Sequence, residues 1–232
     1  MTYKILIIVA VLLASLPGIS VAQAPLSTQK QKFSYAMGFH MVTQLQQKLE
    51  QAGMPFDTST FAQGIEDALS GAQPQLSSVE IQAVIQIQQA QQFVKQATVA
   101  TTNKQAGDSF REANRAKDGV IETASGLQYR VLDEGAGKQP AATSTVVVHY
   151  RGTLVNGEEF DSSYARGEPA TFVGLDGGVI GGWREALQLM QKGAKWELVI
   201  PPELAYGAQG SGDNVIGPNE TLIFEIELIS VK

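Results

Sequence analysis

The sequence predicts an α+β protein made of two parts, a helical part over residues 25–118 and a part rich in antiparallel strands over residues 119–232. The first part is rich in glutamine and electrically balanced, whereas acidic residues clearly outnumber basic ones in the second. Apolar residues recur every three or four positions in the first part, which is typical of helices. In the second part they alternate or form short β-branched runs, which is typical of strands.

Composition excludes several classes of function. The 232-residue chain has no cysteine, which excludes a disulfide scaffold, a cysteine zinc site and a thiol nucleophile. Its only histidines, His40 and His149, are too few for a histidine-rich metal site. The net charge of −6 is unfavourable for nucleic-acid binding, which needs a basic surface. We therefore expect no metal, no cofactor and no nucleic-acid partner.

Residues 1–24 have the pattern of a secretory signal peptide. Lys4 precedes an apolar run from Ile5 to Leu16, and Ala22-Gln23-Ala24 provides small residues for cleavage. The alternative is a membrane anchor, but the apolar run is short for a bilayer about 30 Å thick. The expected location is periplasmic or secreted, with an association with the outer membrane left open.

The first two helices are predicted from an apolar stripe and from capping residues. The stripe has a spacing of four residues, and Gly53 and Pro55 end it. Its members are Phe33, Met37, Met41, Leu45 and Leu49. Asp57 is a suitable N-cap for a second helix, and Gly71 is a suitable residue to end it.

The third helix begins at a capping box, Ser77-Ser78-Val79-Glu80. No glycine or proline follows before Gly107, so a helix from Ser78 to about Ala106 is expected, with room to continue to Lys117. Two short helices and half of a long one make a thin core. A second copy of the chain, bound through residues 25–75, would supply the missing surface. The alternative is that the Met37–Met41 stripe packs within its own chain.

Five strands and one short helix are predicted in the second part. The helix is expected around Trp183–Met190, packed on one face of an antiparallel sheet. The strands are expected at Leu127–Leu132, Thr145–Leu154, Thr171–Val173, Lys195–Ile200 and Thr221–Val231.

Specific strings along this second part identify a family. In order they are Val146-Val147-Val148-His149-Tyr150-Arg151-Gly152, Phe160-Asp161-Ser162-Ser163, Val179-Ile180-Gly181-Gly182-Trp183, Ala205-Tyr206-Gly207 and the run from Ile216 to Phe224. Over residues 120–232 the chain resembles the FKBP family of peptidyl-prolyl cis/trans isomerases. Residues 34–38 and 64–69, with the long helix, are similar to the amino-terminal dimerisation domain of the Mip (macrophage infectivity potentiator) branch.

The resemblance implies a substrate site in the second part. Trp183 would form the floor of a pocket for the proline ring, and the Tyr206 hydroxyl would bind a peptide carbonyl. Asp161 would lie at the rim, with Arg166 as its ion-pair partner. The remaining substrate-binding residues that it implies are Tyr150, Phe160, Val179, Ile180, Val215, Ile216 and Phe224. His149 is expected to face the other side of its strand and to be structural.

The implied function is a peptidyl-prolyl isomerase that speeds the folding of secreted or periplasmic proteins, with added chaperone activity. Its implied partners are proline-containing unfolded or extended polypeptides, macrolide inhibitors of the FKBP class and a second copy of the chain. Two alternatives remain. In the first alternative, the aromatic residues are ordinary core residues. In the second, the domain is a catalytically weak client-holding chaperone or a surface-binding module.

Overall fold

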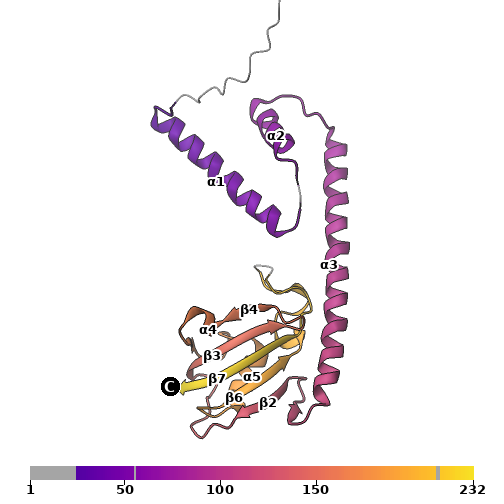
Figure 1. Ribbon diagram of the computed structural model, residues 1–232. Coiled ribbons are helices and arrows are strands. Elements are labelled where there is room, and N and C mark those ends of the chain that lie inside the picture. The colour runs from indigo at the N-terminus through magenta and orange to yellow at the C-terminus, as the bar shows by residue number, and fades with distance from the viewer. Residues whose placement is uncertain (1–24, 55, 213–214) are drawn as a thin grey trace, which may run out of the picture. The chain divides into compact units, whose positions relative to one another are not determined.

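The computed structural model describes residues 25–54, 56–212 and 215–232, and the predicted signal peptide lies outside them (Figure 1). The chain forms two compact units, one that ends at Pro55 and one that comprises Phe56–Lys232. The second unit contains two helices followed by a sheet. The predicted combination of an amino-terminal helical region and an antiparallel sheet is thereby confirmed.

Residues 25–54, the described part of the first unit, form one helix, α1 (Gln29–Gln51). Thr28 caps it by accepting a hydrogen bond from the Gln31 backbone, and the Gln31 side chain closes a capping box. The predicted apolar stripe lies on this helix. Phe33 and Met41 are each 62% exposed, and no member of the stripe is buried.

The second unit begins with α2 (Thr58–Ser70), whose ends are those the sequence predicts. The Asp57 carboxylate accepts a hydrogen bond of 2.8 Å from the Thr60 N–H. Gly71 ends the helix in the left-handed region, with a φ of 71° that favours glycine. None of the residues of α2 is buried.

Helix α3 (Ser78–Arg115) is longer than its minimal prediction and continues through Gly107 without a break. The predicted capping box is present, with Glu80 accepting hydrogen bonds from the Ser77 backbone and hydroxyl. Glycine lowers helix stability by about 1 kcal/mol relative to alanine, but Gly107 is one of two buried residues of the helix. Its tertiary contacts outweigh its weak helix propensity.

All neighbouring strands of the sheet are antiparallel, in the order β1-β2-β6-β7-β3-β4, with β5 also paired to β3. The predicted bounds of β3 and β6 agree with the structure. The strands are β1 (Val120–Glu122), β2 (Gln128–Asp133), β3 (Thr145–Leu154), β4 (Glu159–Ser162), β5 (Ala170–Val173), β6 (Lys195–Ile200) and β7 (Leu222–Val231). The sequence did not predict β1, β4 or the short helix α4 (Ser163–Arg166).

The hydrophobic core lies between the sheet and helix α5 (Gly181–Leu189), which contributes the buried Trp183 and Leu187. Burial along β7 alternates as the sequence predicts, with Phe224 and Ile226 among the buried residues. Two short 3₁₀ turns, Pro202–Leu204 and Gly207–Gln209, lie between β6 and β7. Across the described ranges, no helix is both long enough and apolar enough to cross a membrane.

Candidate active site

Three aromatic rings from three different strands meet around Trp183. The indole is 3% exposed and is carried by α5. Tyr150 of β3 and Phe224 of β7 approach it edge to face, with centroid distances of 4.9 and 5.2 Å. Phe172 of β5 does the same at 5.4 Å. Such edge-to-face pairs are favourable because a positive ring edge meets a negative ring face. The indole is therefore fixed from three strands at once.

Gly152 of β3 makes room for two of these rings. Phe160 of β4 meets Phe224 edge to face at 5.4 Å, and both rings lie over this glycine. A Cβ at position 152 would lie 2.6 Å from Cζ of Phe160 and 2.7 Å from Cε1 of Phe224. Since real Cβ atoms do not approach so closely, this position requires glycine if both rings are to keep their places.

A polar triad lies beside the aromatic cluster. The Tyr150 hydroxyl donates a hydrogen bond of 2.5 Å to Oδ2 of Asp161. Arg166 forms an ion pair with Asp161, and its second nitrogen donates to the Tyr150 oxygen at 2.7 Å. The guanidinium also lies 5.4 Å from the centre of the Tyr150 ring, which adds a cation–π attraction. These contacts fix the position of the Asp161 carboxylate at the edge of the cluster.

Burial and hydrogen bonding also shift the acid–base behaviour of this triad. Burial raises the pKa of Tyr150, and its hydrogen bond to Asp161 adds to the increase. The hydrogen bonds from Arg166 to Tyr150 and then to Asp161 raise the pKa of the guanidinium. The phenol therefore stays a neutral hydrogen-bond donor beside a charged pair at neutral pH.

Three of the other predicted site residues pack on the same core cluster, and two do not. Val179 and Ile180 are partly buried against the core, and Ile180 is the N-cap residue of α5. Ile216 is 5% exposed, and reciprocal hydrogen bonds of 2.8 Å tie it to Ser211. Tyr206 and Val215 are 43% and 51% exposed. These two side chains lie outside the buried core cluster that holds the other apolar site residues.

The sequence interpretation missed two features of this site. Phe172 was not singled out, although the alternation along Thr171–Val173 indicates that its side chain faces opposite to its neighbours. The hydrogen bond from Arg166 to Tyr150 was missed as well, because α4 was not predicted.

His149 occupies the other face of β3, as expected. Its Nδ1 lies 2.9 Å from the Ser163 hydroxyl, and its ring stacks on Tyr164 at 4.5 Å. These contacts indicate a structural role for His149. Within the residues that the structure describes, no group of metal-ligating side chains is arranged to hold an ion.

Comparison with known proteins identifies relatives of both parts of the chain. The sequence profile of the FKBP-type peptidyl-prolyl cis-trans isomerases matches residues 136–229. The profile of the domain amino-terminal to FKBP-type peptidyl-prolyl isomerase matches residues 30–131. Both halves of the sequence interpretation therefore agree with independent matches.

Relatives cover most of the chain. The outer membrane protein MIP of Legionella longbeachae is 42% identical over 211 residues, which are 89% of this chain and 88% of that protein. The peptidyl-prolyl cis-trans isomerase Mip of Coxiella burnetii is 42% identical over 220 residues, or 91% and 90% of the two chains. The crystal structure of FkpA from Escherichia coli superimposes with a TM-score of 0.63 at 40% identity, covering 90% of this chain and 99% of that one.

Proposed function

The chain belongs to the FKBP-type peptidyl-prolyl cis-trans isomerases, and on that basis we propose that it isomerises X–Pro bonds of extracytoplasmic proteins at the Trp183 cluster. The observation that carries this proposal is the convergence of Tyr150, Phe172 and Phe224 on one buried indole. An apolar floor of this kind suits a proline ring. The neighbouring Asp161–Arg166 pair supplies a polar edge for the peptide backbone.

The physical basis of the proposed catalysis is the loss of amide resonance. Rotation about a peptide bond has a barrier of about 18–20 kcal/mol, whereas the cis and trans forms of X–Pro differ by only about 0.5–1 kcal/mol. Uncatalysed exchange takes roughly 10–100 s and can limit folding. A twisted amide is less polar than a planar one, so an apolar site favours the transition state over the ground state. Such catalysis requires no covalent step.

Individual residues take distinct roles in this proposal. Trp183, Tyr150, Phe160 and Phe224 contact the proline ring, with Val179, Val215 and Ile216 around them. The Tyr206 hydroxyl and the Ile180 backbone N–H donate hydrogen bonds to carbonyls of the bound peptide. Asp161, held by Arg166, orients the amide as it twists. Macrolides of the FKBP-inhibitor class would compete for the same surface.

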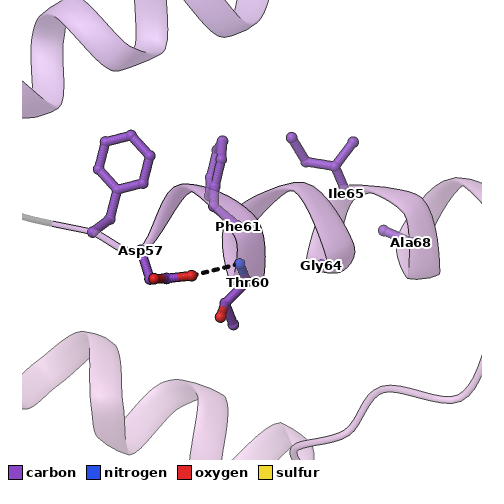
Figure 2. A pocket seen from close by; sticks show the side chains of 7 residues that line it. Asp57, Thr60, Phe61, Gly64, Ile65 and Ala68 are labelled. Atoms are coloured by element: carbon purple, nitrogen blue, oxygen red, sulfur yellow. Dashed lines mark hydrogen bonds between the residues drawn. The ribbon is translucent and has the colours of Figure 1, made fainter. Parts of the chain in front are cut away.

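We further propose that residues 25–75 form a homodimer and that the dimer holds unfolded clients. Phe61 and Ile65 project from one face of α2, and with Ala68 they line a shallow hollow (Figure 2). Phe56 packs edge-on against Phe61 at 5.1 Å and extends this apolar surface. Phe56, Phe61 and Ile65 are partly exposed, and a contiguous apolar surface of this kind is typical of an interface.

The proposed location is the periplasm or the exterior, with an association with the outer membrane left open. The support is the signal-peptide pattern of residues 1–24 and the relative from Legionella longbeachae, which is named an outer membrane protein.

Refolding of a protein limited by proline isomerisation tests the catalytic proposal. We expect the wild-type chain to accelerate the slow phase, and Tyr206→Phe and Asp161→Asn to lose most of that acceleration. Glu159→Gln is the matched control. It removes the exposed ion pair between Glu159 and Arg151, whose charged atoms lie 2.6 Å apart, on the same β3–β4 hairpin that carries Asp161. A wild-type chain that suppresses aggregation but leaves the slow phase unchanged would instead be a client holder.

A further inference from the structure

The loop before β7 is attached to the long helix by side-chain amides. Nδ2 of Asn103 on α3 donates a hydrogen bond of 3.0 Å to the Pro218 carbonyl. From the other side, Nδ2 of Asn219 donates to the Ala100 carbonyl at 3.4 Å. The two contacts join segments more than 100 residues apart in the sequence. They lie about one turn apart on the helix.

Further contacts continue along the same face of α3. Gly107 packs so closely on Thr221 that a Cβ there would lie 2.3 Å from the threonine hydroxyl oxygen. Near the end of the helix, Nδ2 of Asn114 donates to Oε1 of Gln128 at 3.0 Å, and both residues are buried. Positions 100, 103, 107 and 114 fall on one side of a helix with 3.6 residues per turn. The last four turns of α3 are therefore docked on the sheet domain.

The loop that Asn103 holds is connected to the proposed substrate site at two points. Asn219 has a φ of 56°, the one positive φ outside glycine in the described part of the chain. Its backbone N–H donates to the Gly207 carbonyl at 2.9 Å, directly after Tyr206. Ile216, two residues before Pro218, belongs to the core cluster around Trp183. A shift of the Pro218–Asn219 turn would therefore displace both Ile216 and the backbone next to Tyr206.

We infer that Asn103 is a positioning residue for the isomerase site. Its hydrogen bond to Pro218 keeps the 216–219 segment in the arrangement that packs Ile216 into the core cluster with Trp183 and joins Asn219 to Gly207, next to Tyr206. Helix α3 then helps to position the substrate site of the catalytic domain, in addition to connecting that domain to the amino-terminal helices. This inference rests on the proposed function, because it concerns the same substrate site.

Two substitutions in the full-length chain test the role of the amide donor. Asn103→Asp keeps the size of the side chain, but an ionised carboxylate cannot donate to a carbonyl. Asn103→Ala removes the group altogether. We expect kcat/KM on a proline tetrapeptide to fall about fivefold in both, the equivalent of one hydrogen bond. Asn103→Gln, which keeps the donor, should recover part of the activity. Gln105→Ala, an exposed change within the same turn, should retain full activity.

Amide and indole resonances separate positioning from general stability. In Asn103→Asp the Ile216 amide should shift, while the Trp196 indole, which stacks on Tyr129 at 4.3 Å, should stay in place. The inference is overturned if the wild type is active and Asn103→Asp has an unchanged kcat/KM, even if its unfolding midpoint is lower. A wild-type chain that is inactive on tetrapeptides overturns the proposed function instead. In that case an unshifted Ile216 amide in Asn103→Asp would also reject the positioning role.

Discussion

Two aromatic rings occupy the space that a side chain on Gly152 would need, so this residue couples the packing of the sheet to the shape of the candidate site. Phe160 comes from β4 and Phe224 from β7, and β3 lies between them in the sheet. The rings can cross β3 only where it has no side chain. A site built by close approach of rings is sensitive to one added methyl group.

Gly152→Ala is therefore expected to damage both stability and activity. Overpacking of this kind lowers the free energy of unfolding by about 1–3 kcal/mol. Displacement of Phe160 and Phe224 should also reduce kcat/KM on a proline tetrapeptide by roughly tenfold or more. Urea unfolding and the peptide assay measure the two effects. Adding Phe160→Ala should restore part of the stability but not the activity. Wild-type activity in Gly152→Ala would show that these rings do not form the substrate site.

The hydroxyl of Tyr150 gives the site a defined pH limit. Burial and the hydrogen bond to Asp161 raise its pKa above the ordinary value of 10.0. A raised pKa means that the contribution to stability is complete below pH 10 and is lost as the pH rises through the folded-state value. We expect the tyrosinate absorbance of wild type minus Tyr150→Phe to appear only above pH 10. Ionisation of Tyr150 at or below pH 10 in the folded chain would contradict the hydrogen-bonded arrangement.

At the scale of elements, local signals predicted the long pieces and the four-residue strand β5, and missed the other short ones. Asp57 and Gly71 marked both ends of α2, and alternation marked β7, because capping and periodicity are local. The strands β1 and β4 have three and four residues and are defined mainly by their partners, so periodicity had too little length to detect them. Phe172 and the contact between Arg166 and Tyr150 depend on the same tertiary pairing. The site residues named from the sequence came from the family strings, whereas their mutual geometry came from the fold.

Helix α3 provides a prediction in which helix propensity and packing act in opposite directions. Gly107→Ala gains about 1 kcal/mol of helix propensity. The new Cβ, however, would meet the Thr221 hydroxyl oxygen at 2.3 Å, and Thr221 is 1% exposed. We expect a net loss of stability of about 1 kcal/mol, because overpacking in a buried contact exceeds the gain. Urea unfolding measures this change.

Gln105→Ala is the control for this prediction, since it raises helix propensity slightly at an exposed position of the same helix. It should leave the chain as stable as the wild type or more so. Thr221→Ala in the Gly107→Ala background removes the closest atom and should recover part of the loss. A Gly107→Ala chain more stable than the wild type would mean that α3 is not closely docked at Thr221.

At the scale of the whole molecule, the two parts of the chain differ in how they are completed. The sheet domain buries its own core, including Trp183 and Ile226, whereas α2 has no buried residue and Leu69 on it is 84% exposed. Burial of apolar surface stabilises by about 25 cal/mol per Å². The helical part would therefore gain more stability from the proposed second copy than the sheet domain, which already buries its apolar residues within one chain. This difference predicts that dimerisation and peptide catalysis can be separated.

Ile65→Asp on α2 tests that separation. A charge in the proposed apolar interface should convert the dimer to a monomer, as measured by sedimentation, while kcat/KM on a tetrapeptide stays at the wild-type value. Catalysed refolding of a protein substrate should fall by at least about tenfold, because two linked sites bind an extended chain with avidity. Gln63→Glu adds the same charge on the opposite side of α2 and should leave the dimer intact. If Ile65→Asp remains a dimer, the α2 face is not the interface. If it becomes a monomer with full activity on proteins, client capture does not depend on the second copy.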